Sequence, residues 1–272
     1  MRWREWLFRL YVAAVLVFLL APVAVIVLFS FNEARSLSFP IEAFSTKWYD
    51  AAFSNRTVTQ ALENSLVIGG VMIGAVALLG TPAAWAIARH RFPGRAVLLG
   101  TVVAPLAMPG LFIGVALLTF FVSIGVPLSL KTVVVAHVIY TLGFYVLVAS
   151  SRFAGLDAAY DEAARTLGAS KLQSLRLVVW PLVRPALLAA LALCLALSLD
   201  EFVMTFYVIG PENTLPIVIF SNVRSTISPQ INVVATVLLV TSWLAVAAAA
   251  LIAGGLGRRR RVGALVEVVA QR

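Results

Sequence analysis

Two adjacent acidic residues, Asp200 and Glu201, are the residues of this 272-residue chain best suited to bind a charged ligand. They are the only acids within the long apolar runs. An acidic side chain costs at least a few kcal/mol in the hydrocarbon of a bilayer, so such residues usually face a bundle interior or a water-filled cavity. Successive residues of a helix differ in direction by about 100°, so the two carboxylates are expected to point different ways.

One of these acids is therefore expected to line a route for a cationic amine, with Tyr207 adding cation–π attraction. The other acid is expected to fix a helix end or to contact another subunit. In the alternative interpretation, both carboxylates lie near the outer membrane interface and only hold loops, because Asp200 is the sixteenth residue counted from Pro185.

The other reactive residue types form no recognisable enzyme site. The sequence has no Gly-x-x-x-x-Gly-Lys-[Ser/Thr] motif, whose backbone amides would cradle nucleotide phosphates. His90 and His137 are far apart, with no cysteine or carboxylate at metal-ligand spacing, and His137 is expected to be a hydrogen-bonded packing residue. Cys194 is the single cysteine and allows no disulfide within the chain. We therefore predict that the chain binds no metal or cofactor and is not an enzyme.

Long apolar helices must position these residues. Hydrophobic residues make up 61% of the chain and charged residues 12%, about half the charged fraction usual in soluble domains. A helix needs about 20 apolar residues to cross the hydrocarbon. We therefore predict an all-α integral membrane protein with six transmembrane helices in a single domain, residues 1–272. The runs that predict these spans are Leu10–Phe31, Ser65–Ala88, Ala96–Leu130, Thr132–Ser151, Pro185–Ile209 and Ile231–Gly257.

The third run is too long for one straight crossing and contains Pro105, Pro109 and Gly110. Proline inside a helix removes a hydrogen bond and kinks the axis. In lipid this is tolerated where neighbouring protein or a water-lined cavity satisfies the freed carbonyls. We therefore predict a broken span that faces other helices. A kink that only helps packing is the alternative.

The distribution of Lys and Arg predicts the orientation in the membrane. If the N-terminus is cytoplasmic, 16 of the 21 basic residues lie on the cytoplasmic side and 5 on the other, as the positive-inside rule expects. Both termini, including a tail at 258–272, are therefore predicted to be cytoplasmic. The net charge of +9 then reflects topology rather than nucleic-acid binding.

A polar helix pair is predicted in a cytoplasmic loop at about 152–184, between the fourth and fifth spans. Asp157 can N-cap the first helix, and Gly168 fits the C′ position, where a left-handed conformation is needed. Ser170 and Gln173 form a capping box for the second helix. This helix is expected to end where Trp180 precedes Pro181.

The segment EAARTLGASKLQSLRLVVWP, which begins at Glu162, resembles the signature Glu-Ala-Ala-x3-Gly-x9-Ile-x-Leu-Pro of ABC-importer permeases. Val178 and Trp180 replace the usual Ile and Leu. In that family the loop is the coupling helix, which docks into a groove of a separate ATPase subunit. The resemblance implies this role here, and a solvated helix that only connects spans is the alternative. The residues that match the signature are Glu162, Ala163, Ala164, Gly168 and Pro181.

The resemblance covers essentially the whole chain and is closest to the branch that serves spermidine and putrescine, through ENSLVIGG, GVALL and the long segment that begins SLDEFVMTFYVIGPENTLP. It implies a type I importer permease of a bacterial inner membrane, working with two ATPase subunits that use ATP and Mg, a second homologous permease and an extracytoplasmic solute-binding protein. A polyamine is the implied cargo. An opine, 2-aminoethylphosphonate or Fe(III) remains the alternative.

Two other classes of membrane protein fit less well. A stand-alone secondary transporter or channel predicts internal repeats and charged relay residues in several spans, and the sequence has neither. A membrane-embedded enzyme needs convergent His, Asp or Ser at membrane depth, whereas only Asp200 and Glu201 are available.

Overall fold

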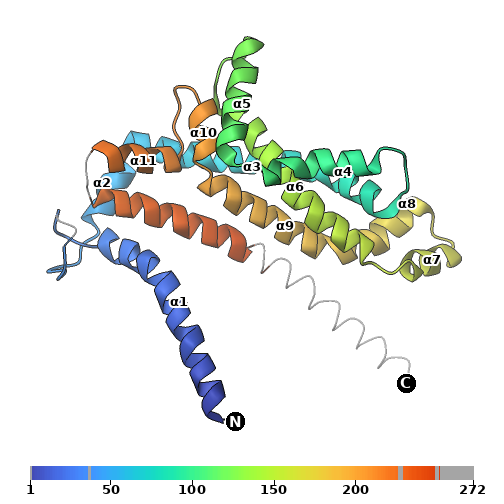
Figure 1. Ribbon diagram of the computed structural model, residues 1–272, viewed down its shortest axis with the longest axis horizontal. Coiled ribbons are helices and arrows are strands. Elements are labelled where there is room, and N and C mark those ends of the chain that lie inside the picture. Colours follow the sequence, from blue (N-terminus) through green and yellow to red (C-terminus); the bar gives the residue numbers. More distant parts are fainter. Residues whose placement is uncertain (1, 36–37, 226–228, 249–250, 252–272) are drawn as a thin grey trace. The chain divides into compact units, whose positions relative to one another are not determined.

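The computed structural model describes residues 2–35, 38–225, 229–248 and 251 (Figure 1). The described residues are mainly helical and form no extended strand. The tail at 258–272 and most of the chain beyond Ala248 lie outside the described residues. The helices are α1 (Arg2–Ser30), α2 (Lys47–Ser54), α3 (Arg56–Arg89), α4 (Arg95–Val103), α5 (Gly110–Ser123), α6 (Leu130–Ala154), α7 (Ala159–Thr166), α8 (Lys171–Ser174), α9 (Trp180–Asp200), α10 (Val203–Val208), α11 (Leu215–Ser225) and a helix over Gln230–Ala248.

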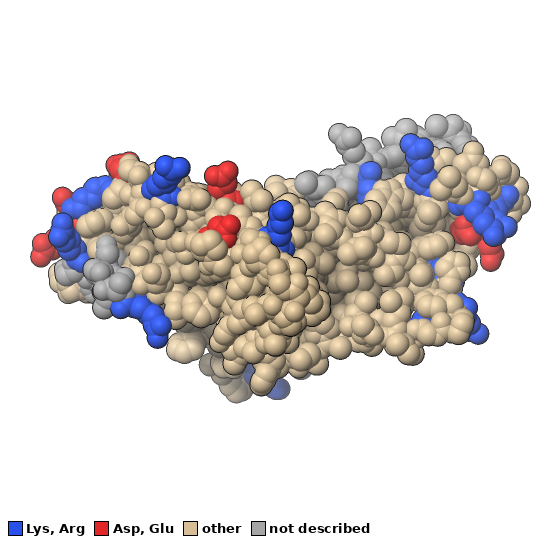
Figure 2. Space-filling model, turned by 90° about the horizontal axis from the view of Figure 1, so that it is seen from above, with Lys and Arg blue, Asp and Glu red and all other residues tan. Residues whose placement is uncertain are grey.

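Five described helices are long and apolar enough to cross a membrane, and a bent pair adds a sixth span if it is counted as one. This confirms the predicted all-α membrane fold. Figure 2 shows the corresponding surface, on which charged side chains are sparse and uncharged residues cover most of the face drawn. The five helices are Trp3–Ser30, Arg56–Arg89, Leu130–Ala154, Lys171–Asp200 and Gln230–Ala248.

The third run is broken, as its prolines predict. Its two parts, Arg95–Ala107 and Gly110–Ser123, meet at an angle of 110°. A 3₁₀ turn, Ala104–Ala107, ends the first part, and Met108 then adopts an extended conformation. The reason is local, because the ring of Pro109 disfavours helical backbone at the residue before it.

The fifth span differs from the prediction at both ends. One helix runs from Lys171 to Asp200, so the expected stop at Trp180 was wrong. Trp180 keeps helical backbone angles, and a π-helical segment, Leu175–Val179, comes directly before it. Local π adjustments of this kind accommodate the N–H that Pro181 lacks. The expected end at Ile209 was also wrong, because Glu201 is extended and the short α10 follows.

By internal contacts the chain divides into two compact units, Met1–Glu63 with Asn213–Val240, and Asn64–Glu212 with Thr241–Arg272. In the first unit, α2 is tied back to the end of α1. The Trp48 indole N–H donates to the Asn32 carbonyl at 3.0 Å, and the Tyr49 and Ser30 hydroxyls are 2.7 Å apart. The prediction of one domain over residues 1–272 stays a prediction.

The second unit has its core between α3, α6 and α9, and α6 and α9 run side by side (Figure 1). Tyr145 of α6 is buried, and its hydroxyl lies 2.7 Å from that of Thr81 on α3. The approach of α4 to α6 requires glycine, since a β-carbon on Gly143 would lie 2.7 Å from the Val102 carbonyl oxygen. All candidate site residues belong to this unit.

Candidate functional site

The polar helix pair forms a compact elbow, residues 157–180, at one end of α6 and α9 (Figure 1). Its first helix, α7, begins one residue later than predicted, because Ala158 occupies the N-cap position. Asp157 still does the capping chemistry, since its carboxylate accepts a hydrogen bond from the Ala159 N–H at 3.0 Å. The two acids of the first turn, Asp161 and Glu162, complement the positive end of the helix dipole.

Gly168 ends α7 in the predicted way. It has φ of +89°, a conformation that glycine adopts without the steric cost of a β-carbon. The Ala169 N–H donates to the Ala164 carbonyl at 3.1 Å, and the Gly168 N–H donates to the Arg165 carbonyl at 3.0 Å. These two bonds form a Schellman motif. A β-carbon on Gly168 would meet no atom within 4 Å, so backbone conformation rather than space requires glycine here.

The turn between α7 and α8 is held by four side chains. The predicted capping box is present, because Ser170 Oγ accepts from the Gln173 N–H at 3.3 Å and Gln173 Oε1 accepts from the Ser170 N–H at 2.8 Å. The buried Ser174 hydroxyl donates to the Asp161 carboxylate. The elbow is therefore one stiff unit rather than two loosely joined helices.

An apolar face of the elbow stays exposed. Tyr160 is 52% exposed and Leu167 is 89% exposed, and Ala163 between them is also exposed. Residues at positions i, i+3 and i+7 share one face of a helix, so these three form a continuous stripe. Tyr160 and Leu167 were not among the predicted site residues, although their spacing in the sequence is the signal that identifies them. A contiguous exposed apolar stripe, rather than a single exposed leucine, marks a candidate surface for contact with another protein.

The residues that match the Glu-Ala-Ala signature occupy two places. Glu162, Ala163 and Gly168 are exposed on the elbow, and Ala164 is half-buried there. Pro181 is half-buried inside α9 and takes no part in the exposed stripe. Its place is the junction where the elbow continues into the span.

Two arginine side chains make hydrogen bonds on either side of the elbow. Arg89 Nη2, at the end of α3, donates to the Leu156 carbonyl at 2.8 Å, just before the elbow. Arg152 Nη2, near the end of α6, donates to the Leu182 carbonyl at 2.9 Å in α9. The two bonds hold the residues just before and just after the elbow against α3 and α6, and the unbroken Lys171–Asp200 helix continues from the elbow into α9.

At the far end of α9, the two acids lie at the break before α10. Asp200 is exposed and Glu201 is half-buried. Glu201 Oε1 accepts a hydrogen bond from the Met204 N–H at 2.8 Å, so this carboxylate caps α10. The backbone carbonyl of Glu201 accepts from the Thr205 hydroxyl at 2.9 Å. Glu201 thus has the helix-end role expected for one acid, which leaves Asp200 as the more accessible carboxylate.

His137 joins three helices behind this break. Its Nδ1 lies 2.7 Å from Ser198 Oγ on α9, and its Nε2 lies 2.8 Å from Thr205 Oγ1 on α10. The ring is buried. This confirms the expectation of a hydrogen-bonded packing residue. The bonds hold α9 and α10 against α6. Since Ser198 and Thr205 flank Asp200 and Glu201 in the chain, His137 helps to fix the backbone that carries the two acids.

The break of the third run lies beside the break that follows α9. A β-carbon on Gly110 would lie 3.8 Å from Glu201 Oε1, and one on Gly114 would lie 3.1 Å from both Met204 Cα and Tyr207 Cδ2. The α5 backbone therefore packs directly on α10, and Tyr207 is half-buried against it. The structure brings Gly110 beside Glu201 and Gly114 beside Tyr207, a link between the two interruptions that the sequence did not predict.

Within the described residues, no three His, Cys, Asp or Glu side chains are grouped as metal ligands would be. The fold and the elbow together define a helical membrane protein with several spans and a rigid polar projection that carries an exposed apolar stripe.

Residues 77–262 match the family described as binding-protein-dependent transport system inner membrane component. The spermidine/putrescine transport system permease protein PotC of Escherichia coli (strain K12) is 33% identical over 244 residues, which cover 89% of this chain and 92% of PotC. The putrescine transport system permease protein PotI of the same strain is 36% identical over 230 residues, 82% of each chain. The chain therefore belongs to this family of transport-system membrane components, and it is a multi-pass permease subunit rather than an enzyme.

Solved structures agree on the fold. A chain of a bacterial alginate ABC transporter, crystallised in complex with an alginate pentasaccharide-bound periplasmic protein, matches with a TM-score of 0.68. The match covers 94% of this chain and 95% of that chain, at 16% sequence identity. At this level of sequence identity, the likeness shows a common arrangement of helices and carries no information about the cargo of this chain.

Proposed function

We propose that this chain is one permease subunit of an ATP-driven importer that carries a polyamine, or a similar small cationic amine, into a bacterial cytoplasm. Similarity to PotC over 89% of the chain supports the class of cargo. The stiff elbow with Leu167 exposed is the observation that carries the importer mechanism. It provides an apolar contact surface for another protein on a chain that has no phosphate-binding motif of its own.

Because this chain has no phosphate-binding motif, the proposed function requires partner subunits that bind ATP. Two ATPase subunits bind ATP and Mg and receive the elbow, with Glu162, Ala163, Ala164 and Gly168 at or near the contact. A second homologous permease completes the translocation route, and an extracytoplasmic binding protein delivers the cargo. Membrane lipid surrounds the spans, and no nucleic acid is involved. The elbow and both termini are cytoplasmic, as the excess of Lys and Arg predicts.

The geometry suggests how ATP hydrolysis moves the cargo. Closure of the ATPase pair displaces the elbow, and the bonds of Arg89 and Arg152 transmit that displacement to three spans. At the opposite end of α9, the adjoining breaks interrupt the helices at the level of Glu201. Irregular backbone at membrane depth is tolerated where it is buried in protein or lines a water-filled cavity. We assign the route to this region, with Asp200 as the carboxylate that meets the cation and Tyr207 of α10 as the aromatic side chain that adds cation–π attraction.

Uptake into proteoliposomes that contain the assembled importer tests this function. Radiolabelled spermidine and putrescine are supplied on the binding-protein side with ATP inside. Asp200→Asn is expected to reduce polyamine uptake, while Asp50→Asn, which removes another exposed acid of the chain, leaves it unchanged. Equal uptake by the two variants contradicts the role of Asp200. Inhibition by an opine, 2-aminoethylphosphonate or Fe(III), but not by excess polyamine, contradicts the proposed cargo.

A further inference from the structure

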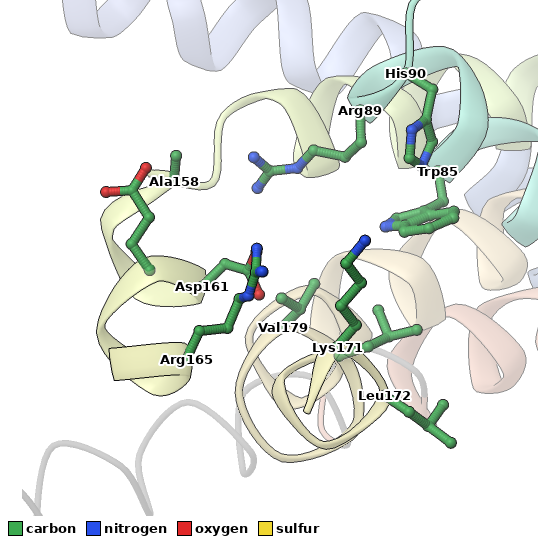
Figure 3. A pocket seen from close by; sticks show the side chains of 11 residues that line it. Trp85, Arg89, His90, Ala158, Asp161, Arg165, Lys171, Leu172 and Val179 are labelled. Atoms are coloured by element: carbon green, nitrogen blue, oxygen red, sulfur yellow. The ribbon is translucent and has the colours of Figure 1, made fainter. Parts of the chain in front are cut away.

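A cavity of about 580 Å³ lies between the end of α3 and the elbow (Figure 3). We call it the basic cavity, because Arg89, Arg165 and Lys171 line it. Figure 3 shows the nitrogen ends of these three side chains directed into the same open space. Trp85 forms part of the wall, and the His90 ring contacts its indole edge-on, with 4.6 Å between the ring centroids.

The positive charge in this cavity is not neutralised by close ion pairs. Asp161 and Glu162 also line it, but the Asp161 carboxylate accepts the hydrogen bond of Ser174. In the part of the chain that the structure describes, Lys47–Glu33 is the only ion pair within 4.0 Å. Three cations and two carboxylates therefore line one space without an ion pair between them, which leaves an excess of positive charge suited to an anion.

A second, apolar cavity of about 450 Å³ adjoins the first. The two cavities share Trp85, Leu172 and Leu175 as lining residues. The apolar cavity is otherwise lined by side chains of the adjacent spans, and its single charged residue is Arg176. These residues are Thr81, Pro82, Phe153, Arg176 and Trp180. The charged cavity and the apolar cavity are therefore adjacent and share part of their lining.

The basic cavity and the apolar cavity, together called the double cavity, lie at the ends of two candidate spans, which indicates their depth in the membrane. Arg89 is the last residue of one candidate span, and Lys171 is the first residue of another. Basic residues at the ends of spans lie at the level of the lipid headgroups, and tryptophan is enriched there. Basic pockets between transmembrane helices on the cytoplasmic side are suited to anionic headgroups. The basic cavity is therefore at headgroup depth, and the apolar cavity is where an acyl chain would be.

We propose that the double cavity binds one anionic phospholipid of the adjacent leaflet. Its phosphate lies among Arg89, Arg165 and Lys171, and one acyl chain lies against Trp85, Leu172 and Leu175. The bound lipid fills the space between α3 and the elbow and supports the elbow from the membrane side. This inference goes beyond the transport function and depends only on the helices spanning a bilayer.

Lipid binding is measured on the full chain in nanodiscs of phosphatidylcholine, with or without phosphatidylglycerol, followed by native mass spectrometry of the released protein. We expect retained phosphatidylglycerol on the unaltered chain. The double variant Arg165→Gln/Lys171→Gln is expected to weaken retention by about 30-fold, the combined effect of two basic side chains near an anionic surface. The matched control is Arg56→Gln/Lys131→Gln, which removes the same charge at two other exposed positions and should retain the lipid.

The acyl chain is located by fluorescence quenching. Phosphatidylglycerol with brominated acyl chains is expected to quench tryptophan emission more than brominated phosphatidylcholine does, and Trp85→Phe should remove most of that difference. Glycerol-1-phosphate, which has the charge without the chains, is expected not to displace the lipid. Displacement by it at equal concentration overturns the lipid assignment in favour of a small-anion site.

Two further results contradict the proposal. Equal retention of phosphatidylglycerol by the unaltered chain and the Arg165→Gln/Lys171→Gln variant means that the basic cavity does not hold the headgroup. Protection of Lys171 from amine-reactive labelling by added ATPase subunits, but not by phosphatidylglycerol, means that the cavity belongs to a protein interface. Neither measurement involves uptake, so failure of the lipid site and failure of the transport function are separate outcomes.

Discussion

Truncation of Leu167 to alanine is the sharpest test of the elbow as the surface that contacts the ATPase. The side chain is 89% exposed, so the substitution removes almost no contact within the chain. The free energy of unfolding is expected to change by less than about 0.5 kcal/mol, as for surface substitutions in general. In the complex, by contrast, the three carbons removed would be buried. Each buried methylene contributes about 0.8 kcal/mol, which gives a loss of about 2 kcal/mol, or about 30-fold in affinity.

The affinity is measured by titrating detached ATPase subunits onto the permease in nanodiscs, with binding-protein-stimulated ATP hydrolysis as a second readout. Leu78→Ala is the matched control, because Leu78 is 75% exposed but lies on α3, inside a span. We expect Leu167→Ala to weaken the ATPase interaction and Leu78→Ala to leave it unchanged. If both variants bind the ATPase as the unaltered chain does, the exposed stripe is not the contact surface.

Three other predictions concern backbone and packing. Gly168→Val is expected to reduce coupled ATP hydrolysis, because a left-handed conformation costs a residue with a β-carbon about 1–2 kcal/mol, whereas Gly168→Asn should retain it. Equal activity of the two variants contradicts the conformational argument. Gly114→Leu is expected to lower the thermal unfolding temperature by separating α5 from α10, while Gly100→Leu, at a position with no atom within 4 Å of its β-carbon, should not. His137→Phe leaves the Ser198 and Thr205 hydroxyls without their ring partner and should destabilise the protein by about 1–3 kcal/mol; unchanged unfolding and uptake would show that this junction is not needed.

Local features of the elbow were largely predictable because short-range chemistry decides them. The capping box of Ser170 and Gln173 and the left-handed Gly168 depend on residues within a few positions of one another. The end of the second helix was not predictable in this way. The rule that a residue before proline avoids helical angles failed at Trp180, because a π-helical segment upstream lets the helix continue into the span.

The amino-acid sequence alone determined the membrane class, the broken third run and the residues of the elbow, because hydropathy, proline and capping act along the chain. Only the tertiary structure decided which residues meet. It placed Gly110 beside Glu201, His137 between Ser198 and Thr205, and Arg89 opposite Lys171. It also showed that the Leu167 side chain is exposed on the elbow. The physical reason is that packing between helices far apart in sequence depends on the angles at which they cross, and no local pattern specifies those angles.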